Sequence, residues 1–113
     1  MDIKIDLFSD TGTRPSDEMR KFMAEAEVGD EQLFEDPSVN RLTEMACELL
    51  GKEDAVYLPS GLMANQISFA VHCSPGDEII MDASAHPIHY EGGATAVISG
   101  ATIRGLEGEH GIF

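Results

Sequence analysis

The sequence predicts an α/β fold in which helices flank a parallel-rich sheet, and three consecutive segments carry that prediction. Residues 54–58 and residues 78–82 are short apolar runs of the length of buried strands. Between them, apolar residues recur every three or four positions over residues 61–73, as on one face of a helix. Strand, helix and strand in this order form the repeating unit of a parallel sheet. Residues 102–104 are a candidate third strand.

Two further helices are expected before this unit. Ser16 is a suitable N-cap for a helix over residues 16–26, and Ser38 is one for a helix over residues 38–50 that Gly51 would end. The apolar residues expected to face a core are Met19, Phe22 and Met23 in the first helix, and Val39, Leu42, Met45, Ala46, Leu49 and Leu50 in the second.

Composition limits the classes of function. The 113 residues fit one modest domain, and 42% of them are hydrophobic and 25% charged, as in an ordinary globular protein. A formal net charge of −14 without a basic block argues against nucleic acid and anionic membranes as partners. Neither a membrane-spanning run nor a signal-peptide core is expected, and Cys47 and Cys73 are typical of reduced core thiols in a cytoplasmic protein.

The turn within residues 57–65 is the most informative stretch. A small-residue turn at Ser60 and Gly61 joins the predicted strand 54–58 to the predicted helix 61–73. A helix start of this kind directs unpaired backbone N–H groups and the positive end of the helix dipole at one point, where they bind phosphate. The alternative is an ordinary turn, because many turns in α/β proteins carry Ser-Gly for steric reasons.

Two patterns raise the question of a metal site. Residues 28–37 form an acidic loop whose spacing matches no calcium-binding pattern, so a solvated loop is favoured. His86 and His89 have the spacing of a helical ligand pair, but Pro87 is expected to break that helix. A ring-contact or buried role for His86 is therefore favoured, and we predict no metal. Because ligands lie at the carboxyl ends of parallel strands, His86 and the Ser60 turn are expected on the same rim.

Several motifs resemble, in order and spacing, the N-terminal part of the low-specificity L-threonine aldolases. These enzymes belong to the aromatic amino acid β-eliminating lyase/threonine aldolase family, which consists of fold-type-I pyridoxal-phosphate enzymes. The resemblance covers essentially the whole chain and implies the start of a large cofactor-binding domain of the aspartate aminotransferase type. It is carried by residues 9–11 with 13–15, 27–30, 35–37 with 39–40, 59–66, 76–78, and 85–86 with 89–91.

The resemblance implies a role for particular residues around the cofactor, pyridoxal 5′-phosphate. The backbone of Gly61 and Leu62, next to Ser60, would hold its phosphate; the family often has Thr at the position of Leu62, so one hydroxyl contact would be lost. His86 would stack on the pyridine ring as the one catalytic residue within this chain.

For the substrate, a small β-hydroxy amino acid, the resemblance implies two contacts. Ser9 would bind its carboxylate, and Glu91 would lie near its β-hydroxyl. Residues 33–34 are Leu-Phe where the family usually carries Tyr followed by Gly, so a tyrosine hydroxyl would be missing from the substrate pocket.

The resemblance further implies the reaction: retro-aldol cleavage of L-threonine or L-allo-threonine to glycine and acetaldehyde. That chemistry requires a Schiff-base lysine. The lysines present are Lys4 in an N-terminal strand, Lys21 on a helix and Lys52 after one, and none has the family's small-residue context. The reactive lysine is therefore expected beyond Phe113.

The chain is accordingly expected to be a piece of such an enzyme and inactive alone. Residues 1–52 would form an N-terminal arm with two helices, and residues 53–113 the start of the large domain. The complete enzyme would be a homo-oligomer, a dimer or tetramer. The alternative is a non-catalytic phosphate-binding or oligomerisation module.

Overall fold

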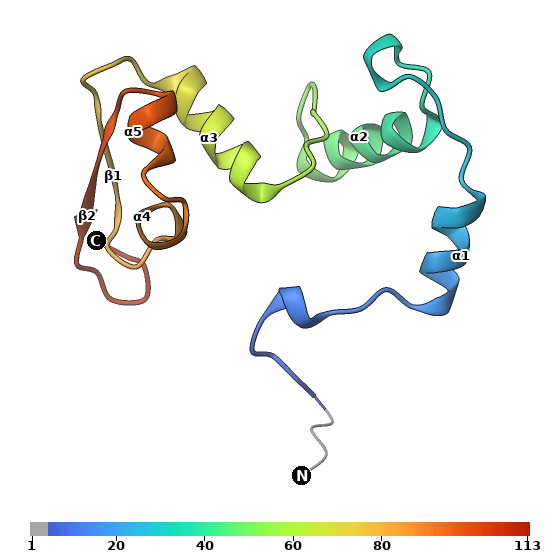
Figure 1. Cartoon of the computed structure of the whole chain (residues 1–113), viewed down its shortest axis with the longest axis horizontal. Helices are drawn as coiled ribbons and strands as arrows, with labels where there is room; N and C mark the ends of the chain where they lie inside the picture. Colours follow the sequence, from blue (N-terminus) through green and yellow to red (C-terminus); the bar gives the residue numbers. More distant parts are fainter. Residues whose placement is uncertain (1–4) are drawn as a thin grey trace. The chain divides into compact units, whose positions relative to one another are not determined.

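The structure is a computed structural model that describes residues 5–113 and contains two compact units, Met1–Tyr57 and Leu58–Phe113 (Figure 1). Lys4 and the beginning of the strand predicted around it lie outside the described residues. Residues 5–8, which are described, form no strand. None of the helices within residues 5–113 has the length and apolar character needed to span a bilayer.

The first unit contains helices α1 (Asp17–Glu25) and α2 (Pro37–Leu50) and two short 3-10 turns, η1 (Asp10–Gly12) and η2 (Glu31–Leu33). Local capping explains both α-helices. The hydroxyl of Ser16 accepts from the backbone N–H of Met19, which confirms the predicted N-cap of α1. Gly51, with φ +62°, ends α2 as predicted.

The predicted N-cap of α2 is wrong by two positions. Asp36, not Ser38, caps the helix: Asp36 Oδ1 accepts from the backbone N–H groups of Ser38 (2.9 Å) and Val39 (3.0 Å). Pro37 occupies the first helical position, where its missing N–H has no partner to lose. The helix therefore begins at Pro37, and Ser38 lies inside its first turn.

The acidic loop before α2 is held by its own carboxylates. Asp36 Oδ2 accepts from the backbone N–H of Gly29 (3.2 Å), and Asp30 Oδ1 accepts from that of Gln32 (2.9 Å). A Cβ added at Gly29 would lie 2.3 Å from the carbonyl oxygen of Glu35, so only glycine fits there. The backbone bonds from Val39 and Gly29 hold the pKa of Asp36 below its ordinary value.

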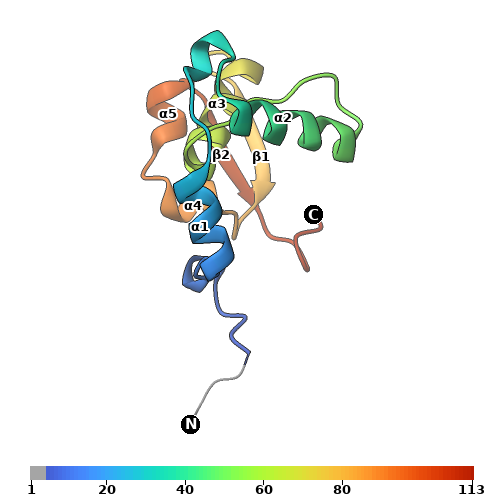
Figure 2. The same ribbon diagram turned by 90° about the vertical axis from the view of Figure 1, so that its right-hand side faces the viewer.

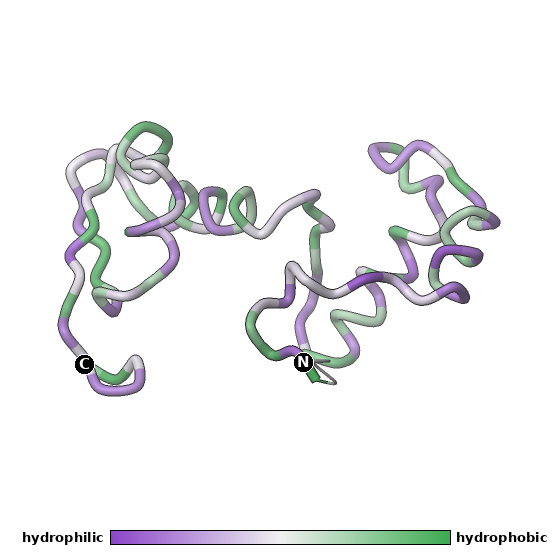
Figure 3. Tube along the Cα trace, turned by 60° about the horizontal axis from the view of Figure 1, so that its bottom comes forward, coloured by the Kyte–Doolittle hydropathy of each residue, from purple (hydrophilic) through white to green (hydrophobic). Residues whose placement is uncertain are grey.

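The apolar stripes of α1 and α2 do not face a core within their unit, contrary to the prediction. Phe22 of α1 is 72% exposed and Leu49 of α2 is 84% exposed. Neither helix packs extensively against another element of the unit. Figure 3 shows apolar and polar residues interspersed along the described part of the chain. Hydropathy therefore indicates which residues favour burial, but it does not identify what would cover them.

The second unit contains the parallel sheet. Strands β1 (Glu78–Asp82) and β2 (Thr102–Leu106) pair in parallel, with Glu78 opposite Thr102 and Asp82 opposite Leu106. Helices α4 (His86–Tyr90) and α5 (Ala94–Ile98) connect the strands, and α3 (Gly61–His72) precedes them. All three helices lie on one side of the strand pair, with α5 in contact with both α3 and β2 (Figures 1 and 2).

The predicted strand at residues 54–58 is wrong, and so is its pairing with residues 78–82. In the described part of the chain, residues 54–58 have no strand structure, and the parallel partner of β1 is β2. The candidate third strand is confirmed and extends to Leu106. The β–α–β unit is therefore built around α4 and α5, one step later in the chain than predicted, and the broad class of a parallel α/β piece holds.

Most of the fully buried residues of the second unit are polar, while its apolar residues are mainly half-buried or exposed. Ala101 is its buried apolar residue, whereas Gln66, Glu91, Thr95 and Ser99 are buried polar ones. Buried polar groups are costly unless they are hydrogen-bonded, so this arrangement directs attention to the partners of Gln66 and Glu91.

Candidate functional site

The loop that leaves the carboxyl end of β1 carries the first site residue. β1 ends at Asp82, and α4 begins four residues later at His86. The prediction that Pro87 breaks a helix here is wrong, because Pro87 lies in the first turn of α4, where no intrahelical N–H is needed. His89 donates from Nε2 to the carbonyl of Ala83 (2.8 Å), so the two histidines have different partners.

Glu91 is the centre of a hydrogen-bond network. Its side chain has no exposed surface. Oε1 accepts from Asn65 Nδ2 (2.7 Å) and from His86 Nδ1 (2.9 Å), and Oε2 accepts from Gln66 Nε2 (2.6 Å). The network therefore joins α3 to both ends of α4.

The charge state of Glu91 follows from these donors. Burial raises the pKa of Glu91, but the hydrogen bonds from Asn65, His86 and Gln66 together outweigh burial and leave that pKa below its ordinary value. The carboxyl group is thus ionised at neutral pH and can only accept hydrogen bonds. His86 must then carry a proton on Nδ1, and in the neutral ring Nε2 holds the free lone pair.

The His86 ring is fixed by a hydrogen bond at Nδ1, and most of its surface is exposed. Its side chain is 61% exposed although Nδ1 is bonded to Glu91. The ring of Tyr90 lies on one side, with 5.1 Å between ring centroids and a tilt of 39°. An aromatic ring fixed in this way suits contact with a second flat ring.

The start of α3 presents backbone donors. Ser60 is the N-cap, and its hydroxyl accepts from the backbone N–H of Met63 (3.1 Å). In the described structure, the N–H groups of Gly61 and Leu62 have no recorded acceptor. A Cβ at Gly61 would meet no atom within 4 Å, so the chain itself does not require glycine there. An anion placed at this helix start would meet the positive end of the dipole and free N–H donors.

These features lie close to the Glu91 network along the helix. Asn65 follows Gly61 by one helical turn, which is roughly 6 Å of axial rise. One unit thus brings together His86, Glu91 and the Ser60–Leu62 helix start. Ser9 belongs to the other unit, where it caps η1: its hydroxyl accepts from the backbone N–H of Thr11 (3.2 Å) and bonds the Thr11 hydroxyl (2.7 Å).

Asn65 and Gln66 are site residues to which sequence reasoning assigned no role. Both are half-buried or buried on α3, and both bond Glu91. The available signal was two adjacent amide side chains in a helix that is otherwise rich in apolar residues. Such residues are buried in a helix only when they have partners.

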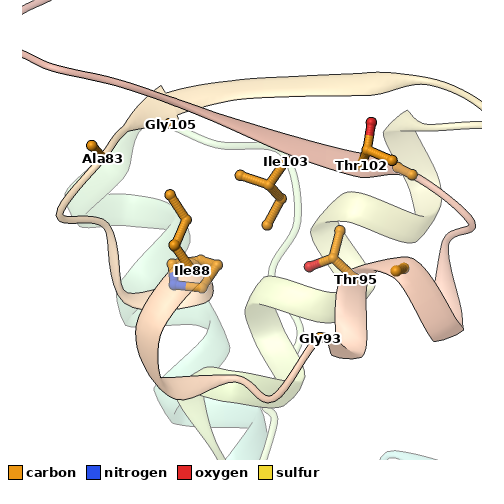
Figure 4. A pocket seen from close by; sticks show the side chains of 10 residues that line it. Ala83, Ile88, Gly93, Thr95, Thr102, Ile103 and Gly105 are labelled. Carbon is orange, nitrogen blue, oxygen red and sulfur yellow. The ribbon is translucent and has the colours of Figure 1, made fainter.

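A separate pocket lies between the sheet and the helices α4 and α5. It measures about 420 Å³, and Ile88, Thr95 and Ile103 point into it from α4, α5 and β2 (Figure 4). Its lining is mainly small and apolar and includes neither His86 nor Glu91. In the described residues no cluster of three or more His, Cys, Asp or Glu side chains is arranged to hold a metal ion.

Fold and site together define an α/β protein with polar side chains gathered at the carboxyl end of a parallel strand, beside a helix start that suits an anion. A sequence model described as beta-eliminating lyase matches residues 6–113, and the chain belongs to this family.

Curated relatives agree with that assignment. The chain is 47% identical over 94 residues to a low specificity L-threonine aldolase of Escherichia coli (strain K12), a match that covers 83% of this chain and 28% of the relative. It is 43% identical over 106 residues to low-specificity L-threonine aldolase 1 of Arabidopsis thaliana, covering 93% of this chain and 30% of the relative. The resemblance inferred from the motifs is thereby confirmed, and the chain spans less than a third of the length of these relatives.

Proposed function

We propose that this chain forms the phosphate- and ring-binding part of a pyridoxal 5′-phosphate-dependent aldehyde-lyase. The reaction would be retro-aldol cleavage of L-threonine or L-allo-threonine to glycine and acetaldehyde. The observation that supports this most directly is the bond from His86 to the buried Glu91, on a network anchored one turn from the start of α3. The names of the relatives support the same reaction class.

The residues present suit the cofactor. The free N–H groups of Gly61 and Leu62 are donors for a phosphate, and the open His86 ring is a surface for a pyridine ring. When bound, the cofactor would supply the electron sink for breaking the bond between the α- and β-carbons. Leu62 offers only its backbone, since its side chain cannot donate a hydrogen bond.

We further propose which residues of this chain contact the substrate. Ser9 would bind the amino-acid carboxylate through its hydroxyl. Glu91 would lie near the β-hydroxyl, and because its side chain is fully covered, it would act there through His86. A proton kept on Nδ1 of His86 leaves Nε2 with a lone pair as an acceptor in the site.

Assembly and location belong to the same proposal. The many exposed apolar side chains, among them Leu49 and Val97, favour a homo-oligomer, a dimer or tetramer. The free thiols of Cys47 and Cys73 favour a cytoplasmic location. The same exposed surface favours the second candidate, a non-catalytic phosphate-binding or oligomerisation module.

Cofactor binding by the chain tests the proposal. Equilibrium dialysis against pyridoxine 5′-phosphate, which has no aldehyde to react with surface lysines, would be followed by absorbance. We expect Gly61→Val to weaken binding far more than Ser60→Ala, since a side chain there obstructs the approach of a phosphate to the backbone. His86→Ala should weaken it roughly fivefold, the value of an aromatic pair of about 1 kcal/mol.

Pyridoxine without phosphate is the matched probe. Its binding should respond to His86→Ala and be unaffected by Gly61→Val, because only the phosphate contacts the helix start. Equal affinities of all variants for pyridoxine 5′-phosphate would mean that the turn at Ser60 is an ordinary one.

A further inference from the structure

Two adjacent amide side chains of α3 converge on one carboxylate far along the chain. Gln66 Nε2 lies 2.6 Å from Glu91 Oε2, and Asn65 Nδ2 lies 2.7 Å from Glu91 Oε1. The side chains of adjacent helical residues point about 100° apart. Asn65 and Gln66 can therefore both reach one carboxylate only if that carboxylate lies between the directions of their side chains. Glu91 lies there, with one oxygen for each amide and Oε1 shared with His86.

The orientation of Gln66 is determined by Glu91. Gln66 is 3% exposed, and its Oε1 is buried without a hydrogen-bond partner in the described structure. Leaving that oxygen unpaired costs free energy, yet turning the amide over would place Oε1 against the carboxylate of Glu91. An apolar side chain of the same size would avoid both penalties, so packing alone does not account for glutamine at this position.

The effect of the amides passes through Glu91 to His86. Three donors leave the Glu91 carboxylate one orientation, and Oε1 in that orientation faces Nδ1 of His86. Without Gln66, Oε2 loses the donor recorded for it, and the carboxylate is free to turn. The proton of the neutral His86 ring would then move to Nε2 in part of the molecules.

We propose that Gln66 and Asn65 are positioning residues, which hold Glu91 so that it keeps the His86 proton on Nδ1 and sets the plane of the His86 ring. The identity of the ligand that this ring orientation serves, a flat heteroaromatic ring, rests on the proposed function. The positioning itself is a property of this chain alone.

The tautomer of His86 is the decisive measurement. Long-range ¹H–¹⁵N correlation spectra of the labelled chain, recorded at a pH where histidine is neutral, distinguish Nδ1–H from Nε2–H. In the wild-type chain we expect Nδ1–H to predominate at His86. Gln66→Met removes the donor at similar volume and should shift the tautomer ratio roughly fivefold toward Nε2–H, the effect of one lost hydrogen bond.

Ser68→Ala is the matched control on α3. Within residues 5–113 the Ser68 hydroxyl bonds the carbonyl of Ala64 one turn back and no group of the Glu91 network, so this variant should leave the His86 tautomer unchanged. If Gln66→Met loses its helical circular dichroism, Asn65→Ala replaces it with the same expected shift, since Asn65 bonds the same carboxylate.

The outcomes separate this inference from the proposed function. Predominant Nε2–H at His86 in the wild-type chain, or an unchanged ratio in the folded amide variants, would overturn the positioning role. A wild-type chain with Nδ1–H at His86 that is sensitive to Gln66→Met, but that binds no pyridoxine 5′-phosphate, would support positioning and overturn the proposed function alone.

Discussion

Asn65 and Glu91 lie 26 positions apart in the sequence and are joined by a 2.7 Å hydrogen bond. The bond connects the second turn of α3 to the residue that ends α4. Among the fully buried residues of this unit only Ala101 is apolar in the described structure, so polar bonds such as this one contribute to holding α3 and α4 together.

The stability of the second unit should depend on the ionisation of Glu91. The folded-state pKa of Glu91 lies below its unfolded value, so its stabilising contribution is complete above the unfolded pKa, about 4.3. The contribution is lost as the pH falls through the folded pKa. Urea unfolding at pH 7, 5, 4 and 3 should therefore show a difference between wild type and Glu91→Gln that shrinks below pH 5. Glu107→Gln, at an exposed carboxylate of the same unit, is the control; a constant difference for Glu91→Gln would contradict the expectation.

Ser60 should stabilise α3 independently of any ligand. Its hydroxyl satisfies the N–H of Met63, and loss of such an N-cap costs about 1 kcal/mol. Ser60→Ala should lower the free energy of unfolding by this amount, and Ser60→Asn should retain most of it. Thermal unfolding followed by circular dichroism measures both variants. Equal destabilisation by alanine and asparagine would show that the hydroxyl has another role.

Phe34 occupies a backbone conformation that suits glycine. Its φ is +58° and its ψ +29°, in the left-handed region, which costs roughly 1–2 kcal/mol for a residue with a Cβ. Because the side chain is also exposed, Phe34→Gly should raise the free energy of unfolding by about 1 kcal/mol. Leu33→Gly, at the neighbouring residue within η2, should lower it. Denaturant unfolding of both variants is the measurement, and stabilisation by both would contradict the explanation.

The chain alone should release no acetaldehyde from L-threonine in the presence of pyridoxal phosphate. Lys21 is 73% exposed and 4.0 Å from Glu25, and Lys52 is exposed after α2, so neither has the desolvated surroundings that activate a lysine amine. A coupled alcohol dehydrogenase assay measures acetaldehyde. Release above a protein-free control, abolished by replacing a lysine of this chain, would contradict the prediction.

Helices α1, α2 and α3 were predictable because local residues determine them, whereas the short helices α4 and α5 were not predicted. Ser16 and Gly51 lie at the ends of their helices as expected, and α3 begins at Gly61 after its cap. The error at α2 has the same origin: Asp36 and Ser38 are both good caps, and Pro37 decides between them by fitting the first helical position.

Pairing and burial were less predictable because they depend on distant residues. The apolar run at residues 54–58 has the composition of a strand, but a strand exists only with a neighbour, and β1 pairs with β2 instead. The resemblance placed His86 on the ring of the cofactor and Glu91 near the β-hydroxyl of the substrate. That Asn65 and Gln66 bond Glu91 could not be read from the sequence, because the contact depends on how α3 lies beside α4.

Gly29 shows how one position can determine a helix that begins eight residues later. The space a side chain would need at residue 29 is filled by the backbone of Glu35 and Asp36, and Asp36 caps α2. In a library of random variants, substitutions at 29 and at 36 should therefore give the same defect, a frayed start of α2. Their double mutant should be little worse than either single one, because the second change has nothing left to disrupt.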